Sequence, residues 1–282
     1  MATDVERAEQ RPETSRGAAV AALIWAVLLA AVVGTWFAAR RWWFPELASQ
    51  QGAQIDRLFT TIFVIIGIVF VLVHATLGFV LWRYASRGGG HRAASWHENP
   101  RLELAWTVIP AVILVTLTVL GGSLWLRVHS AAPPGAMTVE VIAEQFGWRF
   151  HYPGPDGVLA PIDFRGDGRN TPLGLRAELA GAADDVVSRE LYLVVDRPVR
   201  LLIRSKDVIH SFYVPHFRFK QDAVPGRVSQ VVFTPTRTGT FPIVCAELCG
   251  VGHYVMAGTL KVVTADEFAA WLASQPTIGG VR

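Results

Sequence analysis

Long apolar runs fill the first half of the chain, and short alternating runs fill the second. Three runs, at residues 18–39, 58–82 and 102–126, each exceed the roughly 20 residues that a helix needs to cross the hydrocarbon core of a membrane. From Met137 onward, alternating runs such as Val139–Ala143 are separated by Gly and Pro, which is typical of a β-sandwich or barrel. The pattern therefore predicts membrane helices followed by a β-rich domain.

Arginines set the predicted orientation of this arrangement. The stretch between the second and third apolar runs carries Arg83, Arg87, Arg92 and Arg101 against a single acid, Glu98. Because positively charged loops stay on the cytoplasmic side, this loop is predicted to be cytoplasmic. Both ends of the helical hairpin, and the β-rich domain after it, are then predicted to lie on the outer face.

The first apolar run has two interpretations that the sequence leaves open. It is longer than the 7–15 residues usual for the apolar part of a signal peptide, and Phe37 makes a poor cleavage site before Arg40. A retained transmembrane helix would place Arg40 and Arg41 on the outer side, which counts weakly against it. The predicted organisation is an N-terminal segment at 1–57, a transmembrane hairpin at 58–126 and an outer domain at 136–282.

The end of the chain and its overall charge add two expectations. Thr264 and Glu267 have the spacing of a capping box, which predicts a short terminal helix over 268–273. The formal net charge is only +3, and no basic patch is interleaved with aromatic residues, so the sequence gives no indication of nucleic-acid binding. The Gly- and Ala-rich residues 153–185 have no predicted role.

Both cysteines of the chain lie in one short motif. Cys245, Cys249, His253 and Met256 fall within twelve residues, and His210 lies 35 residues before Cys245. Thiolate, imidazole and thioether ligands suit copper better than Mg, Ca or Mn, and two cysteines fit a dinuclear copper centre better than a one-copper blue site. A disulfide is the alternative in an oxidising compartment, although the neighbouring donors favour metal binding.

This motif, C-x3-C-x3-H-x2-M with an upstream H-S-F, closely resembles that of subunit II of the haem–copper cytochrome c oxidases, and the resemblance runs from about residue 55 to 268. It implies a cupredoxin-like Greek-key barrel behind the helical hairpin. It also implies a dinuclear copper centre called CuA, and a Mg site shared with subunit I through the side chain of Glu247. The implied copper ligands are the two bridging cysteines, one histidine on each copper, and axial contacts from a thioether and a backbone carbonyl: Cys245, Cys249, His210, His253, Met256 and Glu247.

The resemblance further implies a role in a proton-translocating oxidoreductase of the bacterial cell membrane. Subunit II would accept electrons from cytochrome c or a small copper protein and pass them to the haem of subunit I, where oxygen is reduced to water. Subunit I, subunit III and membrane lipid are the expected partners. Glu103, in the sequence E-x-x-W-T-x-x-P, would mark the start of a proton-uptake route, while the alternative is a glutamate that snorkels to the headgroups.

One part of the sequence departs from the resembled family. Phe146 stands where the family typically has the tryptophan that receives the electron, and Trp148 keeps the second aromatic position. Arg149 and His151 replace acidic residues, which argues against a strongly basic cytochrome c as the donor. Asp207 is the candidate for donor docking.

Two other function classes fit the sequence less well. A membrane-anchored copper chaperone could also carry C-x3-C and a histidine, but a thioredoxin-like α/β pattern is absent from the sequence and Met256 would have no purpose. A quinol-oxidase subunit would keep the fold and lack the copper ligands, all of which are present here.

Overall fold

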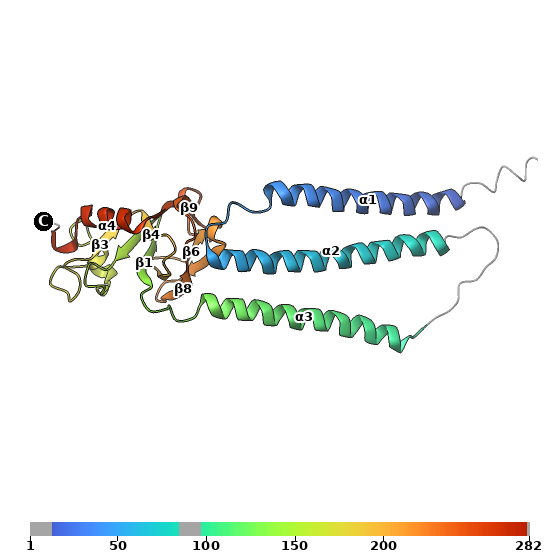
Figure 1. The fold of residues 1–282 in the computed structure, drawn as a ribbon, viewed down its shortest axis with the longest axis horizontal. Coiled ribbons are helices and arrows are strands. Elements are labelled where there is room, and N and C mark those ends of the chain that lie inside the picture. Colours follow the sequence, from blue (N-terminus) through green and yellow to red (C-terminus); the bar gives the residue numbers. More distant parts are fainter. Residues whose placement is uncertain (1–12, 85–96, 281–282) are drawn as a thin grey trace, which may run out of the picture. The chain divides into compact units, whose positions relative to one another are not determined.

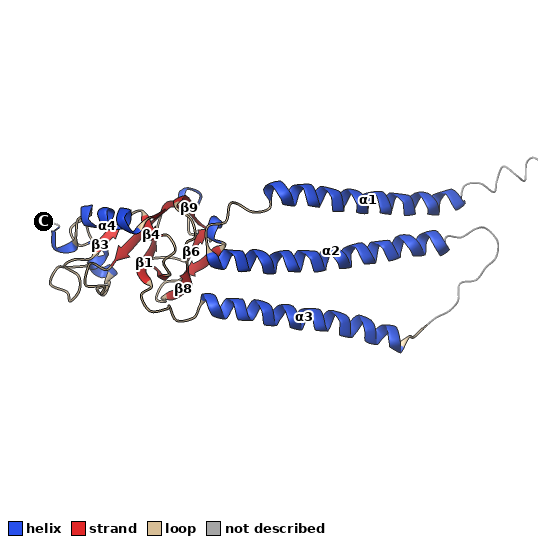
Figure 2. Cartoon of the chain, in the orientation of Figure 1, coloured by secondary structure: helices blue, strands red, loops and turns tan. Residues whose placement is uncertain are grey.

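The structure is a computed structural model that describes residues 13–84 and 97–280. Its contacts divide the chain into two compact units, each described here by itself. The helical unit contains the residues up to Phe44 and the range Leu58–Leu120. The β unit contains Pro45–Arg57 and the chain from Gly121 onward. Figures 1 and 2 show the long helices and the strands that make up the two units.

Three long helices account for the apolar first half. They are α1 (Glu13–Trp42), α2 (Gln50–Tyr84) and α3 (Pro100–Val128). Each is long and apolar enough to cross a membrane, over Ala19–Ala39, Gln50–Tyr84 and Pro100–Val128. The prediction of three long apolar helices is therefore confirmed, and each helix extends beyond the predicted apolar run because its polar ends continue the same turns.

The β unit consists of two five-stranded sheets in a sandwich. One sheet has the order β3-β2-β1-β5-β8 and the other the order β4-β10-β9-β6-β7. Most neighbours are antiparallel, but β1 pairs with β5, and β4 with β10, in parallel. Strands that are distant in sequence, such as β1 and β5, are thus neighbours in one sheet, and this topology confirms the predicted cupredoxin-like fold. The strands are β1 (Met137–Glu144), β2 (Gly147–Tyr152), β3 (Val186–Ser188), β4 (Leu191–Val194), β5 (Val199–Ser205), β6 (His210–Val214), β7 (Phe219–Ala223), β8 (Ser229–Phe233), β9 (Gly239–Cys245) and β10 (Ala257–Val263).

The main core lies between the sheets and is rich in aromatic side chains. Trp148, Phe150 and Phe212 are buried there, with ring centroids of Trp148 and Phe212 5.3 Å apart in an edge-to-face contact. The terminal helix α4 (Ala265–Ser274) covers one end of this core through Phe268 and Trp271. Its capping box is formed as predicted from the sequence.

The residues just before and within the first turns of α2 are hydrogen-bonded to the β unit. Ser49 Oγ donates to the carbonyl of Phe217 at 2.8 Å, and Arg218 donates to the carboxylate of Asp56 at 2.8 Å. The range Pro45–Arg57 therefore belongs to the β unit, whereas the sequence placed it in the N-terminal segment.

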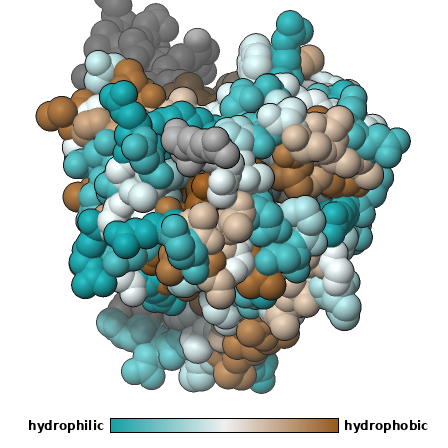
Figure 3. Space-filling model, turned by 90° about the vertical axis from the view of Figure 1, so that its left-hand side faces the viewer, coloured by the Kyte–Doolittle hydropathy of each residue, from teal (hydrophilic) through white to brown (hydrophobic). Residues whose placement is uncertain are grey.

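Residues 153–185 form a cover over the outer face of the first sheet. On β1, Val141 faces the main core while Ile142 packs into a second, smaller cluster with Leu173 and Leu175 of the cover. Successive residues of a strand point to opposite faces, so β1 is buried on both sides. Viewed from the end that bears α4 and β3, the β unit shows hydrophilic surface with several separate hydrophobic areas (Figure 3).

Candidate metal centre

Strand pairing brings the motif and the upstream histidine to the same end of the second sheet. Strand β6 pairs with β9 so that Phe212 lies opposite Cys245, and the Cys245 N–H donates to the carbonyl of Met256 at 3.1 Å. His210 is the first residue of β6 and Cys245 the last of β9. The backbone of His210 already pairs with Ala223 of β7, so this histidine is held by a strand and not by a loop.

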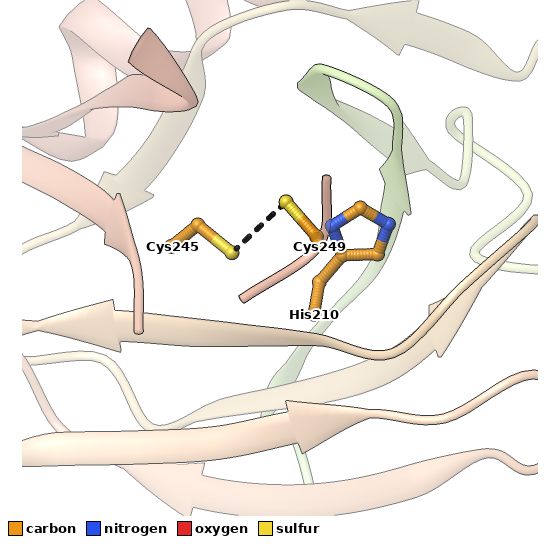
Figure 4. A group of neighbouring side chains, drawn as sticks. All are labelled: His210, Cys245 and Cys249. Carbon is orange, nitrogen blue, oxygen red and sulfur yellow. Dashed lines mark hydrogen bonds between the residues drawn. The ribbon is translucent and has the colours of Figure 1, made fainter. Parts of the chain in front are cut away.

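Four of the predicted donor side chains converge in this place. The Sγ atoms of Cys245 and Cys249 are 3.9 Å apart, and Met256 Sδ lies 3.6 Å from Cys249 Sγ and 3.2 Å from His210 Nδ1. Figure 4 shows the two thiols and the imidazole ring gathered at one point. The Nδ1 of His253 is 3.7 Å from Cys249 Sγ. All five predicted ligand side chains therefore form one group, called the donor cluster below.

The two cysteines are free thiols. Their sulfur atoms are too far apart for a covalent bond of about 2.0 Å. Burial, together with the neighbouring Cys245 thiol, raises the pKa of Cys249 to about 11. Because metals bind the thiolate, a metal ion must displace the proton of this thiol when it binds.

The imidazole of His210 is held from behind by a carboxylate. Asp207 Oδ1 lies 2.7 Å from His210 Nε2, and the other ring nitrogen faces the donor cluster. The backbone N–H groups of Gln145 and Val208 also donate to Asp207, each at 2.7 Å. Burial favours the neutral acid, but these hydrogen bonds outweigh burial and lower the pKa of Asp207. An ionised Asp207 fixes the ring and leaves Nδ1 free to bind a metal.

The chemistry and spacing of the donor cluster fit copper. Two ligands held about 2.0–2.3 Å from one metal ion lie roughly 4 Å from each other, and the contacting pairs of donor atoms here are 3.2–3.9 Å apart. Nδ1 or Nε2 of His210 and the sulfurs of Cys245 and Cys249 all lie within 4.8 Å of one another. Soft sulfur donors in this number select copper rather than hard cations.

Comparison with known proteins agrees with this chemistry. Residues 35–124 match the transmembrane domain of cytochrome c oxidase subunit II, and residues 137–263 match its periplasmic domain. The alternative cytochrome c oxidase subunit 2 of Bradyrhizobium diazoefficiens is 37% identical over 242 residues, covering 85% of this chain and 86% of that protein. The chain belongs to the cytochrome c oxidase subunit II family.

Two further relatives extend the comparison. Cytochrome c oxidase subunit 2 of Cereibacter sphaeroides is 34% identical over 243 residues, covering 81% of this chain and 78% of that protein. A solved periplasmic domain of subunit II from Bradyrhizobium japonicum is 28% identical, covers 51% of this chain and 96% of its own, and gives a TM-score of 0.38. The family models and the curated relatives make this chain a membrane protein with an outer C-terminal domain, part of a copper-containing oxidoreductase complex together with other oxidase subunits.

The two aromatic residues predicted to receive the electron occupy different environments in this subunit II. Trp148 is buried, with its ring centroid 6.3 Å from that of His210. Phe146 is 38% exposed. Its ring lies against the backbone of residues 246–256, the segment between β9 and β10 that is called the copper loop below. A Cβ atom added to Gly252 would lie 2.4 Å from the Phe146 ring, so the glycine of this loop leaves room for the phenylalanine.

Arg149 and His151, which replace acids of the family, do not add positive charge to the surface. Both side chains are buried and point into the cover, where Arg149 pairs with Asp167 and His151 lies between Asp185 and Glu140. Their positive charges are therefore compensated inside the domain and do not face an approaching donor, while the acids that would attract a basic cytochrome c are still missing at these positions.

Gln145 is a residue of the site that the sequence did not single out. Its backbone N–H donates to Asp207, and its side-chain Nε2 donates to the carbonyl of Cys249 at 2.6 Å. Only its position next to Phe146 could have drawn attention to it. Gln145 therefore connects the segment that carries Phe146 and Trp148 both to Asp207, which holds His210, and to the backbone of Cys249.

The two predicted glutamates differ in their surroundings. The carbonyl of Glu247 accepts from Cys245 Sγ at 3.2 Å, while the Glu247 side chain is exposed. Glu103 lies in the first turn of α3, in the helical unit, and its Oε1 accepts from the backbone N–H of Asn99 at 3.4 Å. Glu103 thus contributes to the start of the helix in addition to any role in proton transfer.

Proposed function

We propose that Cys245 and Cys249 are shared by two copper ions, with His210 and His253 as one further ligand each. Met256 and the carbonyl of Glu247 complete the set, as the family resemblance implies. The observation that carries this assignment is the convergence of two free thiols, two imidazoles and a thioether within 4 Å steps of one another. When bound, the copper pair supplies a one-electron carrier between an external donor and the haem of subunit I.

The protein's part in this function is to hold its ligands still. His210 and Cys245 are the end residues of paired strands, and Asp207 fixes the imidazole from the far side. The buried ring of Trp148 packs beside His210 and excludes water from that side. Ligands fixed in this way change little between oxidation states, which keeps the reorganisation on electron transfer small.

Metal analysis and an electron paramagnetic resonance (EPR) spectrum of the purified oxidase complex test the assignment. We expect two coppers in this subunit with one unpaired electron shared by both nuclei. One copper with a localised signal would contradict the assignment and favour the copper-chaperone alternative, which the family comparison does not favour. The same metal analysis also tests whether a Mg ion is bound at Glu247. The exposed carboxylate of this residue would need further ligands from subunit I to hold the ion.

The donor is proposed to dock on an apolar surface around the copper loop. Leu248, Val251 and Tyr254 are 78%, 92% and 86% exposed, and Phe146 packs against Gly250 and Gly252 of the same loop. Large exposed apolar patches mark interaction sites. A cytochrome c or small copper protein with an apolar contact surface would therefore suit this site, with Asp207 contributing local charge.

A charge placed in this surface should slow the donor reaction. We expect Val251→Asp to raise the KM for the donor about tenfold, because a desolvated carboxylate opposes an apolar contact, and to leave the copper spectrum unchanged. Val158→Asp, on the cover and also exposed, is the control and should have no effect.

The assay uses bacterial spheroplasts with donor added outside, so it also tests our proposal that the β unit faces the periplasm across the plasma membrane. Equal effects of both variants, or no oxidation of external donor, would contradict these proposals.

Glu103 is proposed to take up protons at the cytoplasmic end of α3. We expect Glu103→Gln to lower steady-state turnover about tenfold or more while the copper spectrum stays intact. Glutamine still offers an Oε1 to the Asn99 N–H, so the helix start is preserved and only the titratable group is lost. Glu98→Gln, an exposed glutamate just before α3, is the matched control. Unchanged turnover in Glu103→Gln would remove this residue from the mechanism.

A further inference from the structure

A cluster of four charged side chains lies outside the donor cluster and has no part in the function proposed above. Asp167, in the cover, accepts from Arg149 through both carboxylate oxygens, at 2.8 and 2.6 Å. Its Oδ2 also accepts from Lys206 Nζ at 2.5 Å. Arg149 donates in addition to Glu144 Oε2 at 2.6 Å. Two positive and two negative groups thus compensate one another at the edge of the cover.

The cover holds Asp167 firmly in this position. The backbone N–H of Leu173 donates to Asp167 Oδ1 at 2.8 Å, and the Leu173 side chain is fully buried in the smaller core. Thr171 Oγ1 donates to the carbonyl of Gly166 at 2.7 Å, which closes the loop around Asp167. The Asp167 side chain is only 8% exposed. Hydrogen bonds from Arg149 above all, with those from Lys206 and Leu173, hold the pKa of Asp167 well below its usual range despite burial. The carboxylate is therefore charged and fixed by both backbone and side chains.

One branch of this charged cluster leads to His210. Lys206, held by Asp167, is bonded through its backbone N–H to the carbonyl of Ala143 at 2.9 Å. The next residue is Asp207, whose carboxylate holds the Nε2 of His210. A shift of Lys206 would therefore move the group that orients the imidazole.

The second branch leads to the copper loop. Glu144, held by Arg149, is followed directly by Gln145. Gln145 donates from its backbone to Asp207 and from its side chain to the carbonyl of Cys249. The two branches thus meet at Asp207, and one of them also reaches the backbone of Cys249.

We propose that Asp167 is a positioning residue for the copper centre. Its carboxylate holds Lys206 and Arg149, and through them fixes the neighbours Asp207 and Gln145 that orient His210 and the Cys249 loop. The cover of residues 153–185, which had no predicted role, thereby takes part in shaping the metal site. The spectroscopic part of this inference rests on the copper ligands proposed above, whereas the part about the hydrogen-bonded branches does not.

The test compares Asp167→Asn with Asp163→Asn in the complete oxidase complex. Both variants remove one negative charge from the cover, but the Asp163 side chain is 52% exposed and pairs only with the exposed Arg165 among the ion pairs of the described residues. In Asp167→Asn we expect a changed copper hyperfine pattern, a shifted reduction potential and about tenfold weaker copper retention, the usual size of an outer-ligand effect. In Asp163→Asn we expect none of these changes.

Amide hydrogen exchange of the metal-free full chain gives a second readout that needs no copper. We expect peptides that contain Gln145 and Lys206 to exchange at least about tenfold faster in Asp167→Asn, because the side chains of Arg149 and Lys206, which fix these segments, lose a charged partner. Lys206→Met removes the cation of the branch to Asp207, together with its longer contact of 3.4 Å to Glu144, and serves if Asp167→Asn does not fold.

The outcomes separate this inference from the copper assignment. A wild-type complex without the two-copper signal overturns the ligand assignment, and the exchange rates still decide the inference about Asp167. An intact two-copper signal in wild type with unchanged spectrum, potential and exchange in both Asp167→Asn and Lys206→Met overturns the positioning role alone.

Discussion

Replacing Cys249 by serine should abolish the dinuclear copper centre and reduce electron uptake from the external donor by at least about 100-fold. Cys249 is the centre of the donor cluster, since its sulfur lies 3.9 Å from Cys245 Sγ, 3.7 Å from His253 Nδ1 and 3.6 Å from Met256 Sδ. A serine hydroxyl is a hard donor that stays protonated, so it cannot replace a thiolate shared between two copper ions. Copper analysis, the EPR spectrum and stopped-flow reduction of the purified complex measure the effect.

The control for this variant is Val251→Ser in the same loop. Val251 is almost fully exposed and offers no donor atom, so the same residue type is introduced without loss of a ligand. Its copper content and spectrum should match those of the wild type. If Cys249→Ser kept two coppers with a shared electron and normal reduction kinetics, the ligand assignment would be wrong.

Replacing Arg149, a buried charged residue of the first sheet, by methionine should cause a large loss of stability. The Arg149 side chain is 9% exposed and neutralises both Asp167 and Glu144. Methionine keeps the apolar stem but leaves two little-exposed carboxylates with Lys206 as their shared cation. Removing one partner of a buried ion pair costs about 3 kcal/mol or more, which lowers Tm by roughly 6–12 °C for a domain of this size. Thermal unfolding of the detergent-solubilised chain measures it.

Arg165→Met is the matched control, because Arg165 pairs with Asp163 on the same cover while its side chain is 91% exposed. Exposed ion pairs contribute little to stability, so its melting curve should overlay that of the wild type. A Tm for Arg149→Met equal to that of the control would show that the buried cluster contributes nothing to the fold.

Much of the fold follows from the sequence because simple patterns dominate it. The long apolar runs predict the helices, and the alternation in β5, where every second residue is buried, predicts a strand with one face in the core. The start of α2 at Gln50 was missed because its first turns are polar. These turns are held by Ser49, whose Oγ accepts the N–H of Gly52 at 3.0 Å.

Strand β2 shows why the remainder could not be predicted. Its polar residues Arg149 and His151 are buried beneath the cover, so neither face of the strand is exposed to water and polarity no longer reports exposure. The carboxylates that compensate them, on Asp167 and Asp185, come from a segment without regular pattern.

The motif at Cys245–Met256 predicted the donor cluster well, since most of its members are neighbours in sequence. The contact of Asp207 with His210 depends on the loop conformation before β6, which no pattern specifies.

The attachment of Pro45–Arg57 to the β unit has a consequence for proteolytic maturation. Ala48 and Ser49 bond to the chain around Phe217, and Asp56 holds Arg218, so this segment acts as part of the outer domain. If a processing protease removes α1, it must cut before Pro45, whose carbonyl accepts from Arg218, to leave the whole attachment intact. Only Trp43 and Phe44, between the end of α1 and Pro45, are places where such a cut and a complete outer domain are compatible.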